Sequence, residues 1–147
     1  MPQLEFSMNI SAPAEKLIAA ITQYENYEKF LGPQIKSAKV LKETENGTIT
    51  EEIFCFSSVL NHNIVQKSIH KKNQPNKIRT EVIAGPFNGT VLEVSFDSID
   101  SMTRASVFAN VKIELKYKIL TPLIKKYYRT VLMGFLYKMN NIALQSS

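Results

Sequence analysis

Hydrophobic and polar residues alternate along most of this chain, which is the pattern of β-strands with one buried face. The first example is residues 4–10, whose apolar members share one side: Leu4, Phe6, Met8 and Ile10. The later alternating segments are separated by turn-forming residues such as Asn46-Gly47, a dipeptide typical of hairpins. We predict strands over residues 4–10, 35–42, 48–57, 64–70, 77–84, 88–98 and 104–119.

The last of these segments has the cleanest alternation. Its polar residues share one side, with Phe108 as the exception, and its apolar residues share the other: Val107, Ala109, Val111, Ile113, Leu115 and Tyr117. We therefore expect one long strand that continues without interruption to Ile119.

Three segments have helical spacing instead. Ser11 as a cap and Pro13 in the first turn predict a short helix that ends near Ile21. A second short helix, ended by Gly32-Pro33, carries four apolar residues on one side: Tyr24, Tyr27, Phe30 and Leu31.

The third helical segment is the longest. Thr121 as a cap and Pro122 at the first position predict its start, and apolar residues then recur at helical spacing as far as residue 143. Gly134 lies inside this helix, where it either lets a neighbour approach closely or leaves room beside the helix.

The order of elements predicts an α+β fold. One strand, two short helices and six hairpin-linked strands precede the long helix, so we expect a seven-stranded antiparallel sheet. The apolar face of such a sheet needs a cover, and the C-terminal helix has the length and the apolar side to supply it. A chain of 147 residues suits a single domain spanning residues 1–147.

Composition narrows the class of protein. The single cysteine, Cys55, excludes a disulfide framework and a multi-cysteine metal site. A lone cysteine is compatible with a reducing cytoplasm, and no run of apolar residues is long enough to span a membrane. We expect a cytoplasmic protein.

Basic residues gather near the C-terminus. Between Lys112 and Lys138 the chain has one acid, Glu114, against seven basic residues: Lys112, Lys116, Lys118, Lys125, Lys126, Arg129 and Lys138. Lys125, Lys126, Arg129 and Lys138 could contact an anionic membrane or RNA. The same residues also fit the solvated side of an amphipathic helix, which is the interpretation we favour.

The sequence offers few groups for acid–base chemistry. We expect His62, in a predicted turn, to be solvated. His70 ends a strand on the same side as Ile64, Gln66 and Ser68 and could point inward, but we favour a surface position for it. Cys55 lies between two phenylalanines and is expected to be a buried, unreactive thiol.

Two adjacent acids lie in the segment 48–57. Glu51 and Glu52 point to opposite faces of a regular strand, so one of them would face inward and need a partner such as Arg79 or Arg104. We favour a solvated edge position for this acid. We assign no catalytic residue and expect neither a metal nor a cofactor.

Three local motifs resemble the helix-grip fold of the SRPBCC (START-like) superfamily. Residues 10–17, ISAPAEKL, are similar to its strand-to-helix junction. Residues 24–31, YENYEKFL, followed by Pro33 and Ile35, resemble its "D-x-x-x-Y-x-x-W/F-x-P-x-V" segment. Gly85-Pro86-Phe87 resembles a turn of the polyketide cyclase/dehydrase and coenzyme-Q-binding-like branch, although the chain has no tryptophan where the coenzyme-Q-binding and ribosome-associated-toxin proteins usually carry one.

The resemblance implies a curved sheet wrapped around the long helix, with a cavity between them. The expected cavity residues are Tyr27, Phe30, Phe54, Phe56, Arg79, Phe87, Leu92, Val94, Phe96, Val111, Ile113, Tyr128, Leu132 and Phe135. Candidates for polar contacts with a ligand are Tyr117, Tyr127, Tyr128 and Arg79.

The resemblance also implies function. We expect a protein that binds or transports a hydrophobic small molecule, such as a lipid, a quinone or a polyketide-like compound, rather than an enzyme. Two alternatives stay open: a polyketide cyclase/dehydratase-like enzyme, and an interaction module that uses the basic C-terminal helix on a membrane or the ribosome. The sequence leaves the oligomeric state open.

Overall fold

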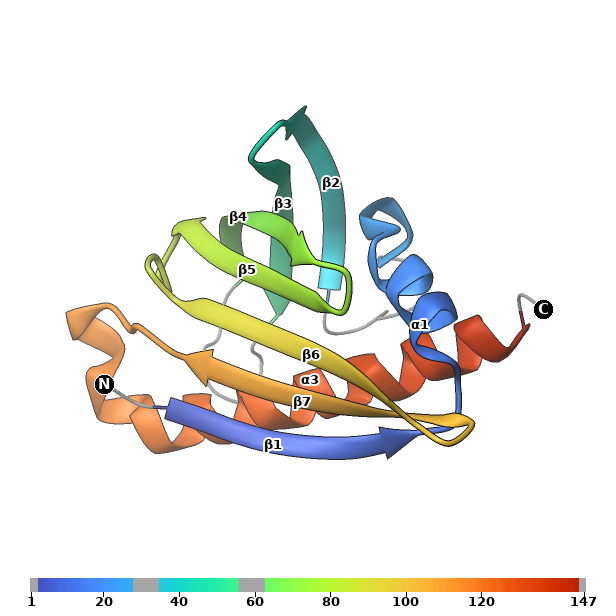
Figure 1. Ribbon diagram of the computed structural model, residues 1–147. Helices are drawn as coiled ribbons and strands as arrows, with labels where there is room; N and C mark the ends of the chain where they lie inside the picture. The colour runs from blue at the N-terminus through green and yellow to red at the C-terminus, as the bar shows by residue number, and fades with distance from the viewer. Residues whose placement is uncertain (1–2, 28–34, 56–62, 146–147) are drawn as a thin grey trace.

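The computed structural model describes residues 3–27, 35–55 and 63–145 (Figure 1). Its strands are β1 (Gln3–Ile10), β2 (Ile35–Thr44), β3 (Gly47–Cys55), β4 (Asn63–Gln74), β5 (Lys77–Ala84), β6 (Val91–Ile99) and β7 (Met102–Asn110). Helix α1 (Ala14–Ile21) and the 3-10 helix η1 (Tyr24–Asn26) lie between β1 and β2. After β7 come the 3-10 helix η2 (Leu115–Leu120) and the long helix α3 (Thr121–Gln145).

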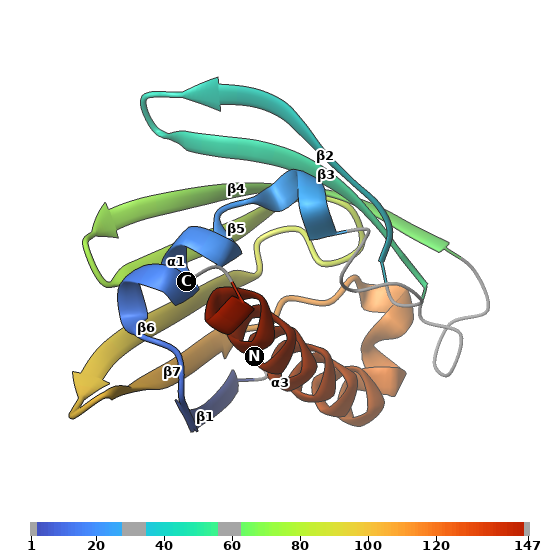
Figure 2. The same ribbon diagram turned by 90° about the vertical axis from the view of Figure 1, so that its right-hand side faces the viewer.

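The strands form one antiparallel sheet in the order β1-β7-β6-β5-β4-β3-β2. Strands β2 to β7 follow one another as neighbours, and β1 pairs with β7 at one edge. Figure 2 shows the sheet curling over α3, which crosses beneath its concave side. The predicted seven-stranded sheet with a long C-terminal helix is confirmed. Of the second predicted short helix, Phe30 and Leu31 lie outside the described residues.

The expectation that the last strand reaches Ile119 is wrong. Strand β7 ends at Asn110, which pairs with Gln3 of β1 and with Val91 of β6. Each partner is the first residue of its strand, so the pairing of β7 with both neighbouring strands ends at Asn110. The Thr90 side chain satisfies Lys112 instead, because its Oγ1 accepts from the Lys112 N–H at 2.9 Å.

Both predicted helix caps differ in the structure. Pro13, in extended conformation, is the N-cap of α1, and its carbonyl accepts the first helical hydrogen bond from Leu17. Ser11 therefore lies two residues too early to cap the helix. Thr121 has helical backbone angles because α3 continues from η2, and its hydroxyl donates to the Lys118 carbonyl at 2.6 Å.

Helix α3 is fixed to the rest of the fold at its C-terminal end. Leu136, Met139 and Ala143 are buried in the main core together with residues of α1 and Phe96. The Asn140 Oδ1 accepts a hydrogen bond from the backbone N–H of Ala12 at 2.8 Å. Gly134 lies on the opposite, exposed side, where an added Cβ would meet no atom within 4 Å. Gly134 therefore neither creates space between α3 and the sheet nor allows a close approach of the two.

Candidate functional site

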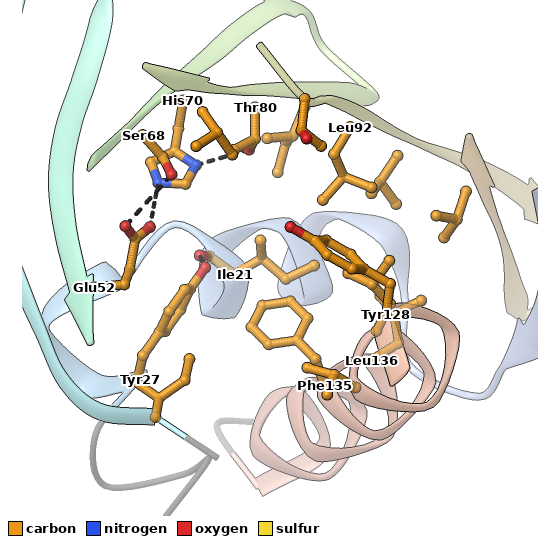
Figure 3. Close-up of a pocket in the computed structure, with 18 of the residues that line it drawn as sticks. Ile21, Tyr27, Glu52, Ser68, His70, Thr80, Leu92, Tyr128, Phe135 and Leu136 are labelled. Carbon is orange, nitrogen blue, oxygen red and sulfur yellow. Dashed lines mark hydrogen bonds and ion pairs between the residues drawn. The ribbon is translucent and has the colours of Figure 1, made fainter. Parts of the chain in front are cut away.

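A cavity of about 170 Å³ lies between the concave face of the sheet and α3 (Figure 3). The strands contribute inward-facing side chains at every second position, and α3 contributes one apolar side. The apolar and aromatic lining residues are Ile21, Tyr24, Tyr27, Ile35, Phe54, Ile78, Val82, Leu92, Val94, Phe96, Val107, Tyr127, Tyr128, Val131, Leu132, Phe135 and Leu136.

Polar side chains gather on the part of the cavity wall that is made by β3, β4 and β5. We call them the polar end of the cavity: Thr50, Glu52, Gln66, Ser68, His70 and Thr80. Strand register brings them together, because three cross-strand pairs lie side by side: Thr50 with Ser68, Glu52 with Gln66, and His70 with Thr80. Thr90 is the remaining polar residue of the lining.

His70 is held on both ring nitrogens. Its Nδ1 lies 2.7 Å from Thr80 Oγ1, and its Nε2 lies 2.9 Å from Thr50 Oγ1. The ring also stacks on Tyr24, with centroids 4.3 Å apart and planes inclined by 17°. These contacts fix the imidazole at the cavity wall.

Glu52 is connected to His70 through Thr50. The Thr50 hydroxyl donates to Glu52 Oε1 at 2.8 Å, so its oxygen is left to accept a hydrogen bond from the N–H of His70 Nε2. The same carboxylate oxygen lies 3.7 Å from Nε2, and the side chains of His70 and Glu52 are 9% and 8% exposed. The chain of contacts suits a neutral imidazole, with Thr80 donating to Nδ1, as well as an imidazolium paired with Glu52.

Three tyrosines beside the polar end have raised pKa values. Burial raises the pKa of Tyr24 to about 12. Burial, and then the charges of Tyr24 and Glu52, raise the pKa of Tyr27 well above its usual value of 10. Burial and the Glu52 charge raise the pKa of Tyr128 as well. All three side chains are therefore neutral hydroxyls at physiological pH.

Two polar groups of the cavity could bind a ligand, and one of them has no hydrogen-bond partner within the described part of the chain. Gln66 Oε1 is buried and makes no hydrogen bond, while the amide nitrogen of the same residue donates to Ser68 at 3.4 Å. The Tyr128 hydroxyl points into the cavity in Figure 3. Buried polar atoms are normally hydrogen-bonded, so Gln66 Oε1 is free to accept a hydrogen bond from a ligand, and the Tyr128 hydroxyl faces the same space. The Tyr27 hydroxyl, in contrast, donates to the Ile21 carbonyl.

The structure brings most of the expected cavity residues into the cavity wall. These are Tyr27, Phe54, Leu92, Val94, Phe96, Tyr128, Leu132 and Phe135. Tyr27 and Phe135 meet edge to face across it, with ring centroids 5.1 Å apart. Phe30 and Phe56 lie outside the described residues.

Four expected residues do not line the cavity. Arg79 lies on the other face of β5 and bonds Glu93 Oε1 at 3.0 Å, because alternation along the strand sends only its neighbours Ile78 and Thr80 inward. Phe87 is fully buried behind the wall and packs edge to face on Tyr128. Val111 and Ile113 follow the end of β7 and pack in neighbouring parts of the core.

The expectations for His70 and Glu52 are wrong. Both were expected at solvated positions, and both line the cavity. The signal that could have found them is alternation itself, because His70 shares a side with Ile64, Gln66 and Ser68, and Glu52 shares one with Thr50. The partner of Glu52 is not an arginine, as expected, but Thr50 together with His70.

Within the ranges that the structure describes, no three His, Cys, Asp or Glu side chains are grouped so that they could hold a metal ion. Helix α3 and the other described helices are too short or too polar to span a membrane. The described residues that line the cavity present hydroxyl, amide, carboxylate and imidazole groups to an apolar space.

One known protein family matches most of the chain. The sequence profile of the family described as polyketide cyclase / dehydrase and lipid transport matches residues 10–139. No curated protein matches the chain in sequence.

Solved structures share the whole fold at low sequence identity. The protein TTHA0849 from Thermus thermophilus is 15% identical, with 99% of each chain covered and a TM-score of 0.84. A START superfamily protein from Mycobacterium smegmatis is 17% identical, with 99% of each chain covered and a TM-score of 0.80. The Zhui aromatase/cyclase from Streptomyces sp. R1128 is 11% identical over 98% of this chain and 94% of its own, with a TM-score of 0.83. At these identities the likeness shows the fold alone.

Proposed function

The chain belongs to the polyketide cyclase/dehydrase and lipid transport family, and from this premise we propose that it binds an apolar small molecule between its sheet and α3. The observation that carries the proposal is a cavity walled by aliphatic and aromatic side chains with hydrogen-bonding groups confined to the polar end. Ligand sites of proteins have this composition, in which the polar groups orient a mainly apolar molecule.

The size of the cavity supports a small, ring-containing ligand. A cavity of roughly 150 Å³ lined by aliphatic and aromatic residues accepts benzene in other proteins. The space here, about 170 Å³, suits a ligand of about that size. Each Å² of apolar ligand surface removed from water contributes about 25 cal/mol before the costs of association.

The polar end supports a ligand with a hydroxyl group. Gln66 Oε1 and the Glu52 carboxylate accept hydrogen bonds, so they match a donor on the ligand. The Tyr128 hydroxyl, on the facing helix, can serve the same group as donor or acceptor. A quinol, a phenol or a hydroxylated polyketide ring has this chemistry, and a lipid, quinone or polyketide-like compound remains the class that we propose.

Native mass spectrometry of the freshly purified protein, followed by organic extraction, tests this proposal. Leu132→Trp fills the cavity from α3, whereas Tyr137→Trp adds the same side chain on the exposed side of that helix. We expect a defined apolar molecule with the wild type and with Tyr137→Trp, and none with Leu132→Trp. Equal amounts on both variants would contradict binding in this cavity, and an empty wild type would favour the enzyme described next.

A second candidate function is a cyclase/dehydratase-like enzyme, and the contact chain from Glu52 through Thr50 to His70 favours it. An imidazole coupled to a carboxylate can accept a proton from a substrate carbon through the Thr80 hydroxyl, which lines the cavity and contacts Nδ1, and the same relay can return the proton to a leaving hydroxyl. An aromatase/cyclase among the similar structures gives the reaction class. The test is ring formation from a linear poly-β-ketone thioester, followed by aromatic absorbance. His70→Gln should abolish it, and a rate unchanged in that variant would exclude His70 as the catalytic base.

A further inference from the structure

The segment from η2 to the first turn of α3 carries the most exposed large apolar side chains of the structure. Leu115 is 82% exposed and Ile119 is 88% exposed, and Leu123 follows at 52%. No other large apolar residue in the described ranges is more than 56% exposed. Figure 1 shows this segment beyond the end of β7, at one end of the molecule. Apolar side chains this exposed indicate a contact surface.

The segment is anchored from its inner side, so the exposed residues cannot turn inward without breaking the core. Tyr117, Leu120 and Ile124 pack in the cluster around Phe87, and Ile124 is fully buried. The backbone is fixed as well, since the N–H of Glu114 donates to the Pro86 carbonyl at 3.0 Å. Apolar residues therefore occupy both sides of one short segment, one side in the core and one in solvent.

Lysines accompany the exposed apolar residues. Residues three apart share a face of a 3-10 helix and are neighbours on an α-helix, which places Lys118 beside Leu115 and Lys126 beside Leu123. Both lysines are exposed. We define the docking surface as Leu115, Lys118, Ile119, Leu123 and Lys126.

Two other basic residues of α3, Arg129 and Lys138, contribute less to this surface. The Arg129 guanidinium lies over the ring of Phe6, 5.6 Å from its centre. Lys138 lies twelve residues beyond Lys126, a distance of about 18 Å along the helix. The interpretation of the lysines as only a solvated face is therefore incomplete, because it leaves Leu115 and Ile119 without a role.

We propose that the docking surface binds the headgroup region of a membrane that contains anionic lipids. Exposed leucine and isoleucine side chains enter the boundary between headgroups and acyl chains, while lysines bind the negative surface. A second copy of this chain fits less well, since it would bring the same lysines together. RNA also fits less well, because single-stranded bases are bound on aromatic or arginine side chains, and this surface presents aliphatic ones.

The docking surface leads directly into the cavity wall. Tyr127 and Tyr128, one turn beyond Leu123, line the cavity. When the protein is bound to a membrane through this surface, its cavity therefore lies close to the lipid. The proposal does not depend on the proposed function, since the surface and the cavity share no residue.

A tryptophan reporter in the full-length chain tests the docking surface. The chain has no tryptophan, so Leu115→Trp creates a single reporter, and Tyr137→Trp places a matched one farther along the exposed side of α3. With vesicles of phosphatidylcholine and phosphatidylglycerol, we expect a blue shift of emission for Leu115→Trp and none for Tyr137→Trp. Vesicles of phosphatidylcholine alone should bind at least about tenfold more weakly, because they lack the anionic surface.

Vesicle flotation of surface variants separates the apolar from the electrostatic contribution. Leu115→Ser combined with Ile119→Ser should weaken binding by about tenfold or more. Replacing Lys118 and Lys126 by Gln should weaken it by about fivefold for each lysine. The matched control combines Ile99→Ser, an exposed apolar residue at the end of β6, with Lys72→Gln, an exposed lysine of β4, and should bind as the wild type does.

Four results would overturn the proposal. The first two are no binding to anionic vesicles and an equal loss of binding in the control variant. The third is a serine variant with unchanged affinity whose binding is lost only at high salt, as expected of an RNA-binding surface. The fourth is a concentration-dependent dimer that the serine variant abolishes.

Discussion

Glu52 shows what a single residue contributes to this site. A carboxylate in an apolar cavity is costly unless it is hydrogen-bonded, and here the hydroxyls of Thr50 and Ser68 and the His70 ring supply the partners. Burial, and to a smaller extent the Glu52 charge, raises the pKa values of Tyr27 and Tyr128, so the cavity keeps neutral hydroxyls around one acidic group. The polar end is thus a small set of fixed donors and acceptors.

Tyr24 leads to a prediction about stability at high pH. In the unfolded chain its hydroxyl ionises near pH 10, but in the folded protein burial raises the pKa to about 12. The folded state therefore keeps its proton while the unfolded state loses it, and stability falls as pH rises through this window. We expect a loss of about 2 kcal/mol from Tyr24 between about pH 9 and pH 12.

Urea unfolding at pH 8, 10 and 11 measures this effect. Tyr24→Phe should keep nearly the wild-type free energy of unfolding at pH 8 and lose less of it at pH 11. Tyr137→Phe, on the exposed side of α3, should follow the wild-type curve throughout. A Tyr24→Phe curve with the full wild-type slope would show that Tyr24 ionises freely in the folded protein.

At the scale of elements, α3 is attached through one side chain as well as through its apolar side. The Asn140 Oδ1 accepts from the N–H of Ala12, a residue that is fully buried between β1 and α1. From the other side the Thr103 hydroxyl donates to the Ala12 carbonyl at 2.7 Å. The two hydrogen bonds fix this junction against the end of the long helix.

Asn140→Ala should therefore destabilise the fold. It leaves the buried N–H of Ala12 without a partner, which costs about 1–3 kcal/mol in the free energy of unfolding. Asn141→Ala, at the exposed neighbouring position, should change the free energy by less than about 0.5 kcal/mol. Urea denaturation of both variants measures their free energies of unfolding. Equal losses of this free energy would mean that the Asn140 hydrogen bond contributes nothing of its own.

Element type was predictable from the sequence because period-two alternation and turn residues act locally. The bounds 77–84 of β5 agree with the predicted strand, and β1 starts one residue earlier than predicted. The end of β7 was not predictable from local sequence, because the alternation of apolar and polar residues continues to Tyr117. The strand ends at Asn110 because its pairing partners, Gln3 and Val91, are the first residues of β1 and β6. The predicted cap at Thr121 was wrong for a related reason, because η2 precedes α3 directly and gives Thr121 helical backbone angles.

The candidate site was predictable in its apolar part only. Phe54, Leu92 and Val94 are large residues on the apolar side of their strands, and the sheet brings them together. Whether His70 and Glu52 face the cavity depends on strand register, because Thr50 and Thr80 reach His70 only once β3, β4 and β5 are aligned. A single sequence shows neither the register nor the space that the cavity leaves.

On the scale of the whole molecule, α3 belongs both to the cavity wall and to the docking surface, although the sequence pattern predicts only one amphipathic helix. Its inner side closes the cavity with Tyr128, Leu132 and Phe135, and its first turn continues the docking surface. The arrangement fits a protein that holds an apolar molecule out of water. This function requires that the cavity bind such a molecule.

Nuclear magnetic resonance with phenol, a one-ring molecule of about the size of benzene with one hydroxyl donor, tests this claim most directly. The measurement is the set of intermolecular NOEs from the phenol ring protons to the labelled methyl groups of the full-length protein. We predict contacts with the methyls of Val107, Leu132 and Leu136, which line the cavity. Contacts confined to exposed methyls such as those of Leu115 and Ile119, or no contacts at all, would contradict an apolar binding site between the sheet and α3.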